Sequence, residues 1–215
     1  MHGRSGLMKL KGLVDEDFVQ YKKPSMFIIA PYCSFKCDKE AGCEVCQNSD
    51  LAAAPIIEIE PTELVKRFYE NPITEAVVFG GLEPFDSFEE MTEFLSLLVC
   101  GASVYQKPIP DIVIYTGYYF SEIKNKVNAY STYKNAGAKV IIKYGRFIPN
   151  RPSRFDEVLG VELASNNQFA VDMFNLPKGD EDSILYQLEM YYKTIPLKDE
   201  GEIIENMLKS FNKLT

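Results

Sequence analysis

Residues 76–98 have the sequence AVVFGGLEPFDSFEEMTEFLSLL, which contains one complete strand, loop and helix pattern. The apolar run at 76–79 predicts a buried strand, and the amphipathic stretch at 88–98 predicts a helix. The same unit recurs, with further strands expected at 26–30, 112–115 and 140–142 and further helices at 62–69 and 120–127. Strands that alternate with helices indicate crossover connections. The sequence therefore predicts an α/β fold with a mostly parallel sheet.

The pattern changes after Gly145, where a proline-containing segment occupies residues 147–156. The elements expected beyond it are a strand or hairpin around 158–174 and helices at 180–192 and 201–214. A chain of 215 residues is long enough for one compact domain with a substantial core. We therefore expect a single domain over 1–215, with a core at about 24–174 and a C-terminal helical extension at about 178–215.

The overall composition argues against two classes of partner. A formal net charge of −8 repels the phosphate backbone, so nucleic acid is not expected as a partner. No apolar stretch approaches the ~20 residues that a membrane helix needs, and the first residues lack the apolar core of a signal peptide. We expect no membrane partner and a cytoplasmic location.

Four of the five cysteines are gathered in one short segment, CSFKCDKEAGCEVC, as Cys33, Cys37, Cys43 and Cys46. A cytoplasmic chain keeps its thiols reduced, so this spacing indicates metal ligation rather than disulfides. The only histidine is His2, which removes Ser-His-Asp sites and histidine-ligated metals from consideration. The spacing fits a four-cysteine zinc site, and it also fits an iron-sulfur cluster held by three thiolates with one iron left open. The cysteine spacing alone does not distinguish the zinc site from the iron-sulfur cluster.

A second motif, FGGLEP at 79–84, follows the strand at 76–79. Parallel α/β sheets bind ligands at the carboxyl ends of their strands, where this motif lies. Gly80 and Gly81 allow a ligand to approach the backbone closely, and Glu83 offers a carboxylate to an ammonium group. A Gly-Gly turn beside an acid is common in proteins. This motif alone therefore does not indicate a ligand site, and we interpret it together with the other motifs of the chain.

These motifs together resemble those of a known superfamily. CSFKC after the first strand and GGLEP after the second resemble the CxxxC-containing loop and GGEP motif of radical S-adenosylmethionine (SAM) enzymes. IYTGY at 114–118, GRF at 145–147 and ASNNQ at 164–168 resemble, in the same order, segments of the small activating proteins of anaerobic ribonucleoside-triphosphate reductase. The resemblance implies a partial, open β/α barrel that cleaves SAM reductively to a 5′-deoxyadenosyl radical.

The resemblance also implies a set of cofactor ligands. Cys33, Cys37 and Cys46 would hold a [4Fe-4S] cluster, and the amino and carboxylate groups of SAM would chelate its open iron. The residues expected to contact SAM are Gly80, Gly81 and Glu83 at its methionine end, Thr116 and Gly117 near its ribose or carboxylate, and also Pro84. Asn167 and Gln168 are expected either to contact adenine or the partner, or to bond backbone near a closing strand.

The chain departs from the superfamily's patterns at three points. The usual CxxxCxxC spacing is stretched, so that Cys33, Cys43 and Cys46 form an alternative ligand set. GGLEP carries the additional Leu82, and the Gly-Pro-Gly near the N-terminus of the reductase activators has no counterpart here.

The resemblance implies that the partner is a glycyl radical enzyme, an anaerobic ribonucleotide reductase, and that a protein such as flavodoxin or ferredoxin is the electron donor. Two alternatives remain. The chain could act directly on a small molecule or peptide, or it could be a non-enzymatic module stabilised by zinc.

Two further features of the sequence are expected to have structural rather than catalytic roles. Cys100 ends an apolar helical stretch, TEFLSLLVC, and is expected to be a small buried hydrophobic residue. Tyr118 and Tyr119 are expected to be packing or surface aromatics rather than radical relays.

Overall fold

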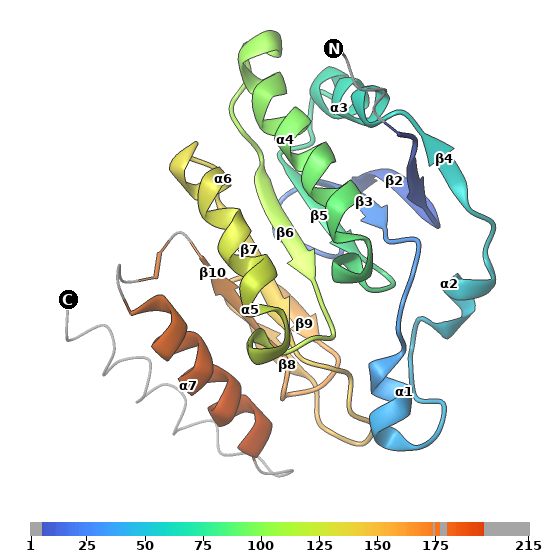
Figure 1. Cartoon of the computed structure of the whole chain (residues 1–215), viewed down its shortest axis with the longest axis vertical. Helices are drawn as coiled ribbons and strands as arrows, with labels where there is room; N and C mark the ends of the chain where they lie inside the picture. Colours follow the sequence, from blue (N-terminus) through green and yellow to red (C-terminus); the bar gives the residue numbers. More distant parts are fainter. Residues whose placement is uncertain (1–5, 174, 177–179, 196–215) are drawn as a thin grey trace.

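The structure, a computed structural model, describes residues 6–173, 175–176 and 180–195. Within these residues a six-stranded sheet forms the centre, in the order β10-β7-β6-β5-β3-β2 (Figure 1). Its strands are β2 (Gly12–Asp17), β3 (Ser25–Ile29), β5 (Ala76–Gly80), β6 (Asp111–Tyr115), β7 (Val140–Tyr144) and β10 (Phe169–Asp172). The middle four strands run parallel, whereas β2 and β10 pair antiparallel at the two edges. The predicted α/β class and mostly parallel sheet are confirmed.

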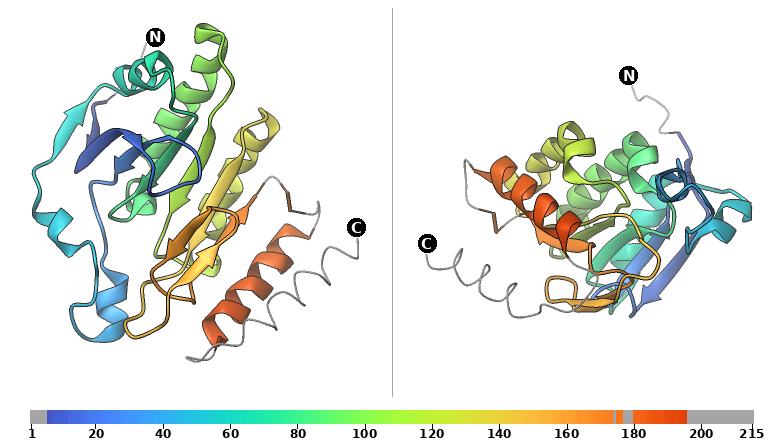
Figure 2. Two further views of the ribbon diagram at one scale, coloured as in Figure 1. Left: turned by 180° about the vertical axis from the view of Figure 1, so that it is seen from behind. Right: turned by 90° about the horizontal axis from the view of Figure 1, so that it is seen from below.

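Helices cover one face of this sheet, as the two views in Figure 2 show. They are α3 (Pro61–Glu70), α4 (Phe88–Tyr105), α5 (Phe120–Val127), α6 (Ser131–Asn135) and α7 (Glu181–Thr194), with 3-10 turns η1 (Pro84–Ser87) and η2 (Asn128–Tyr130) before α4 and α6. Alternate strand residues such as Val77, Ile112 and Ile142 face these helices and are fully buried. Because successive side chains of a strand point to opposite sides, the residues between them form the other face.

The opposite face is buried by loops. Val78 and Val113 pack there against Tyr21, from the connection between β2 and β3, and against Leu159. Leu159 belongs to the loop of an antiparallel hairpin formed by β8 (Arg154–Asp156) and β9 (Val161–Leu163). The Tyr21 hydroxyl donates a hydrogen bond to Asp111 at 2.8 Å. Burial on both faces explains why the parallel strands are apolar without alternation.

Most predicted elements lie close to their expected bounds. The helix expected at 180–192 is α7, and the hairpin or strand expected around 158–174 corresponds to β9 and β10, with β8 just before it. The helix expected at 201–214 lies outside the described residues. The prediction missed β2 and also β1 (Met8–Leu10) and β4 (Ile57–Ile59), which pair with each other. The cysteine-rich loop contains two unexpected short helices, α1 (Lys36–Ala41) and α2 (Ser49–Ala53).

The prediction for Cys100 is wrong, because its side chain is exposed. Gly101 and Ala102 face the core at that turn of α4, where a Cβ on Gly101 would lie 2.7 Å from the Tyr69 ring. The helix therefore turns Cys100 toward solvent. None of the described helices is both long enough and apolar enough to cross a membrane.

Candidate functional site

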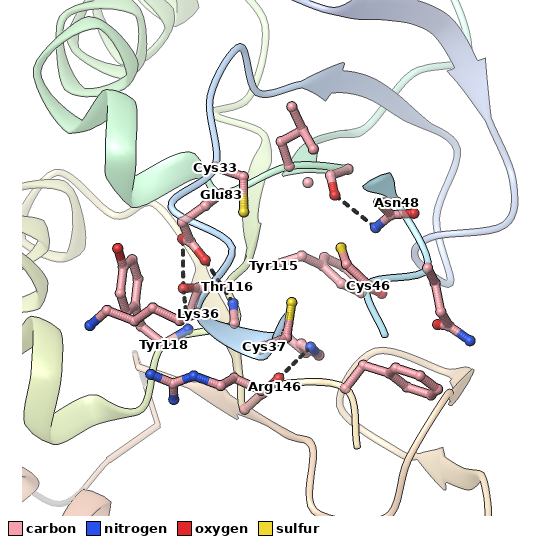
Figure 3. Close-up of a pocket in the computed structure, with 18 of the residues that line it drawn as sticks. Cys33, Lys36, Cys37, Cys46, Asn48, Glu83, Tyr115, Thr116, Tyr118 and Arg146 are labelled. Atoms are coloured by element: carbon pink, nitrogen blue, oxygen red, sulfur yellow. Dashed lines mark hydrogen bonds between the residues drawn. The ribbon is translucent and has the colours of Figure 1, made fainter. Parts of the chain in front are cut away.

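A cavity of about 260 Å³ lies at the carboxyl ends of the parallel strands (Figure 3). Every predicted site residue except Pro84 lines it: Cys33, Cys37, Cys46, Gly80, Gly81, Glu83, Thr116 and Gly117. Pro84 is buried in η1, directly after Glu83. The fold thus brings together residues that are as far apart in the sequence as Cys33 and Gly117.

The first cysteine is fixed by the loop after β3. Phe35 adopts the left-handed conformation, with φ 49°, and its backbone N–H donates to the Cys33 sulfur at 3.3 Å. The backbone N–H of Ser34 donates to Asp86 at 2.6 Å, which ties this loop to η1. The turn directs the Cys33 side chain into the cavity.

The other two predicted ligands are brought together by Asp38. Its Oδ1 accepts the backbone N–H groups of Val45 and Cys46, both at 2.8 Å, and so closes the segment between α1 and α2. Cys37 and Cys46 both line the cavity. Cys43 is exposed and is not part of the cavity wall.

The thiols of Cys33 and Cys37 are protonated at neutral pH. Burial raises the pKa of Cys33 to about 11. Burial, and then the charge and hydrogen bond of Cys46, raise the pKa of Cys37 to about 12. As the side chains stand, no group of three or more His, Cys, Asp or Glu within the described residues is close enough to hold a metal ion. The predicted ligand set, and the choice between Cys37 and Cys43, stay predictions.

The two glycines at the end of β5 are required by their protein neighbours. A Cβ on Gly80 would lie 3.0 Å from the Phe27 ring and 3.3 Å from Cβ of Tyr115. Gly81 has φ +75°, which favours glycine, and a Cβ there would lie 2.6 Å from Ile29. Glycine at both positions lets the GGLEP loop turn tightly over the sheet and present Glu83.

Glu83 is the buried centre of the cavity wall, with 6% of its surface exposed. Its Oε1 accepts the Thr116 hydroxyl at 2.7 Å and the Phe85 N–H at 3.1 Å, and its Oε2 accepts the Gly117 N–H at 2.9 Å. Burial raises the pKa of this carboxyl to about 7, against the lowering effect of the three hydrogen bonds. The structure thus joins Glu83 to Thr116 and Gly117 in one hydrogen-bonded group.

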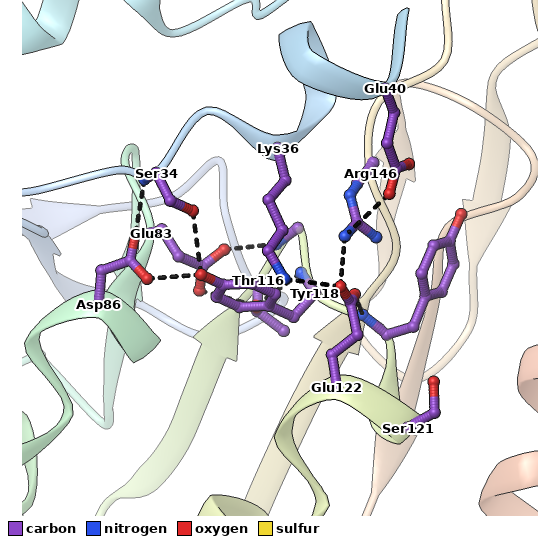
Figure 4. A network of polar contacts seen from close by, with 12 residues as sticks. Ser34, Lys36, Glu40, Glu83, Asp86, Thr116, Tyr118, Ser121, Glu122 and Arg146 are labelled. Carbon is purple, nitrogen blue, oxygen red and sulfur yellow. Dashed lines mark hydrogen bonds and ion pairs between the residues drawn. The ribbon is translucent and has the colours of Figure 1, made fainter.

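Tyr118 connects the cysteine loop to η1 (Figure 4). Its hydroxyl donates to Asp86 at 2.6 Å and lies 3.0 Å from the Ser34 hydroxyl. Burial, followed by the hydrogen bond to Asp86, raises the pKa of this phenol. Tyr118 is 9% exposed and Tyr119 is 7% exposed, consistent with the expected packing role.

A second polar network joins α1 to α5, also drawn in Figure 4. Glu122 accepts Lys36 at 2.8 Å and Arg146 at 2.6 Å, and Arg146 lies 3.2 Å from Glu40. Burial alone would raise the pKa of Glu122, but the hydrogen bonds from Arg146 and Lys36 outweigh it and hold the pKa at about 2. Arg146 also stacks over the Tyr119 ring, with 5.0 Å from its guanidinium carbon to the ring centroid.

Asn167 and Gln168 bond backbone near the closing strand. The Asn167 side chain donates to the carbonyl oxygen of Arg146 at 2.8 Å. The Gln168 side chain accepts the Ser165 N–H at 3.2 Å and donates to the carbonyl oxygen of Gly145 at 3.2 Å. Gln168 also lines the cavity, so it is the one of the two that a ligand could contact.

The polar residues of this site that sequence reasoning missed include Asp38, Asp86 and Lys143. Asp38 and Asp86 lie among other acids and carry no distinctive pattern. Lys143 had a usable signal, because it interrupts the apolar run VIIKY at a position where the strand is buried on both faces.

Comparison with known proteins returned no match, whether with protein families, with curated proteins or with solved structures.

Proposed function

We propose that this chain is a radical SAM enzyme that holds a [4Fe-4S] cluster through Cys33, Cys37 and Cys46. The observation that carries the proposal is the convergence of these three thiols and the Glu83 carboxylate on one cavity. That cavity lies at the carboxyl ends of parallel strands, the edge at which α/β sheets bind ligands. We further propose that the sheet and its helices form an open β/α barrel.

The chemistry of the donor set suits such a cluster. Three soft sulfur ligands face one cavity, and the fourth cysteine of the segment, Cys43, is turned away from it. All five cysteines are free, and ligand thiols lose their protons when a metal binds. When bound, the cluster would supply the electron that cleaves the sulfonium carbon–sulfur bond of SAM, giving methionine and a 5′-deoxyadenosyl radical. A cytoplasmic location belongs to the proposal, because such thiols must stay reduced.

Glu83 suits the ammonium group of SAM. A carboxylate offers about four acceptor positions, and Thr116, Phe85 and Gly117 use three of them. The remaining position can accept an ammonium N–H, and a positive charge there would favour the ionised carboxylate against the effect of burial. Thr116 and Gly117 hold the Glu83 carboxylate in place by hydrogen bonds. Their proposed role near SAM therefore includes positioning this carboxylate.

The substrate that we propose is a glycyl radical enzyme, an anaerobic ribonucleotide reductase. Support comes from the ordered segments YTGY, GRF and ASNNQ, because Thr116, Gly117, Arg146 and Gln168 from these segments all line the cavity. A flavodoxin or ferredoxin would deliver the electron.

The cofactor is tested by anaerobic reconstitution with iron and sulfide. We expect about four irons per chain and a visible absorption that dithionite bleaches. Added SAM should then give methionine and 5′-deoxyadenosine, measured by chromatography. Stoichiometric zinc without iron in protein purified without oxygen would support the zinc module instead.

The partner is tested separately. The reduced, cluster-loaded protein is mixed with SAM and an anaerobic ribonucleotide reductase from the same source. A glycyl doublet in the electron paramagnetic resonance spectrum is expected. SAM cleavage without that doublet would favour direct action on a small molecule or peptide.

A further inference from the structure

The cysteine segment lacks a hydrophobic anchor. Residues 32–60 contain no buried residue, although they include both α1 and α2. By contrast, α3, which follows directly, buries Leu64, Val65 and Phe68. Figure 1 shows α1 and α2 outside the layer of helices that covers the sheet. Burial of apolar surface is the main source of stability in a folded chain, so a segment without it can open locally at little cost.

This segment forms one wall of the cavity. We call residues 33–54 the arm; Cys33, Cys37 and Asn48 are among the arm residues that line the cavity (Figure 3). The chain is fixed at both ends of the arm. Before it, the backbone N–H of Ala30 donates to the carbonyl oxygen of Gly80 at 3.0 Å, and after it β4 pairs with β1. Movement of the arm between these points would open the cavity.

Two ion pairs hold the first half of the arm against the body of the domain (Figure 4). Lys36 donates to Glu122 at 2.8 Å, and Glu40 lies 3.2 Å from Arg146. The Lys36 ammonium also lies 4.4 Å from the centroid of the Tyr118 ring. The arm side chains of both pairs are partly exposed, Lys36 by 40% and Glu40 by 60%. Water and salt therefore compete with both pairs.

The second half of the arm is also attached mainly through polar groups. The Asn48 side chain donates to the carbonyl oxygen of Gly81 at 2.7 Å, and Lys11 donates to the carbonyl oxygen of Ala52 at 2.8 Å. Leu51 approaches Gly81 but is only half-buried. Because water can replace such exposed hydrogen bonds, breaking them costs far less than exposing a packed core.

We propose that the arm is a gate of the cavity, held closed by the ion pairs of α1 with Glu122 and Arg146. The gate opens when these pairs and the Asn48 hydrogen bond break, while the sheet and its covering helices stay folded. Ligands enter and leave the cavity in the open state. This inference goes beyond the proposed function, because the gate acts whichever cofactor or ligand the cavity holds.

The test measures access to Cys33 in the reduced, cluster-free protein. A maleimide that carries a large fluorophore is too bulky for the closed cavity, and mass spectrometry gives the labelling rate of each thiol. The exposed Cys100 is the internal reference. Lys36→Met should speed labelling of Cys33 relative to Cys100 by about two- to fivefold, the range for a partly exposed ion pair. Loss of a nearby cation disfavours the reactive thiolate, so the faster labelling cannot come from that charge.

Two further measurements isolate the ion pair. Lys36→Arg keeps the charge and should restore slow labelling of Cys33. About 1 M sodium chloride should speed labelling of Cys33 in the wild type more than in Lys36→Met, because salt screens the pair that the variant has already lost.

The matched control is Lys124→Met. Lys124 lies on α5, as Glu122 does, and it also combines an ion pair with a ring contact, at 2.7 Å from Asp182 and 5.6 Å from the centroid of the Tyr186 ring. Those partners belong to α7 rather than to the arm. Lys124→Met should therefore label Cys33 at the wild-type rate.

An unchanged rate in Lys36→Met, or an equal acceleration in Lys124→Met, would overturn the gate. So would labelling of Cys33 with the same urea dependence as global unfolding, because the arm would then open only when the whole domain unfolds. These outcomes leave the proposed cofactor untouched, since that is tested by iron content.

Discussion

Asp38 accepts a hydrogen bond at 2.8 Å from the backbone N–H of Cys46, eight residues further along the chain. This bond folds the second half of the cysteine segment back onto α1, and Cys46 and Cys37 both line the cavity. The arrangement of the predicted ligands therefore depends on a carboxylate that is not itself expected to touch the cluster.

Replacing Asp38 should loosen the cluster. In Asp38→Ala the N–H groups of Val45 and Cys46 lose their acceptor, and the segment should sample more conformations. We expect iron release to a chelator to become several-fold faster, measured from the loss of visible absorption. Glu44→Ala, an exposed change in the same segment, is the control. Equal release rates in the two variants would show that Asp38 does not organise the loop.

The cysteine variants distinguish the two ligand sets. Cys46→Ala should prevent cluster retention, because it removes a thiolate that both sets require. Cys37→Ala should do the same, whereas Cys43→Ala and Cys100→Ala should keep about four irons per chain. Both of the latter thiols are exposed. A colourless Cys43→Ala protein beside a brown Cys37→Ala protein would assign the cluster to Cys33, Cys43 and Cys46.

The sequence predicted the parts of the fold that local pattern determines. Apolar runs such as 76–79 and 112–115 have no alternation, which favours central parallel strands, and these form the middle of the sheet. β2 was missed because its sequence GLVDED is charged, as suits an edge strand exposed to solvent. Cys100 was misplaced because apolar neighbours on a helix do not fix which side of the last turn faces the core.

The site was predictable only where residue type and position coincide with a motif. Glu83, Thr116 and Gly117 follow strand ends, and parallel strands bring such residues to one edge. The partners that hold them come from distant segments, as Asp86 does for Ser34 across 52 positions. Spacing along the chain carries no information on such contacts, which depend on how the loops fold over the strand ends.

Glu122 should give acid-dependent stability. Its pKa is held at about 2, below the usual 4.5, so its contribution is fully present above pH 4.5 and is lost as the pH falls toward 2. Glu122→Gln should lower the free energy of unfolding by about 1–2 kcal/mol at pH 7, after allowance for its partial exposure. Urea denaturation of the cluster-free protein at pH 7 and pH 3 should show the difference shrinking in acid.

The control for this prediction is Glu40→Gln, which removes the more exposed partner of Arg146, with 60% of its side chain exposed. Its effect should stay below about 0.5 kcal/mol at either pH. A Glu122→Gln deficit that is the same at both pH values would mean that the charge of Glu122 is not the source of its contribution.

Alanine substitutions at two glycines of the cavity wall should have different effects on the stability of the protein. Gly81→Ala must adopt φ +75° and place its Cβ 2.6 Å from Ile29, so it should destabilise the protein by on the order of 2 kcal/mol or more. A Cβ on Gly117 would meet only Glu83 Oε2 at 3.5 Å and Arg146 Cγ at 3.9 Å, which are ordinary contacts.

Gly117→Ala should therefore unfold at the wild-type temperature. Its methyl group lies between two residues of the cavity wall, however, where it would take space from a ligand held by Glu83. We expect weaker binding of S-adenosylhomocysteine to the cluster-loaded variant, by about tenfold, equivalent to ~1.4 kcal/mol of lost contact and steric strain. Thermal unfolding and equilibrium binding on the same preparation check both halves. Wild-type affinity in Gly117→Ala would place the ligand away from the end of β6, and a lowered unfolding temperature would mean that Gly117 is needed for packing rather than for binding.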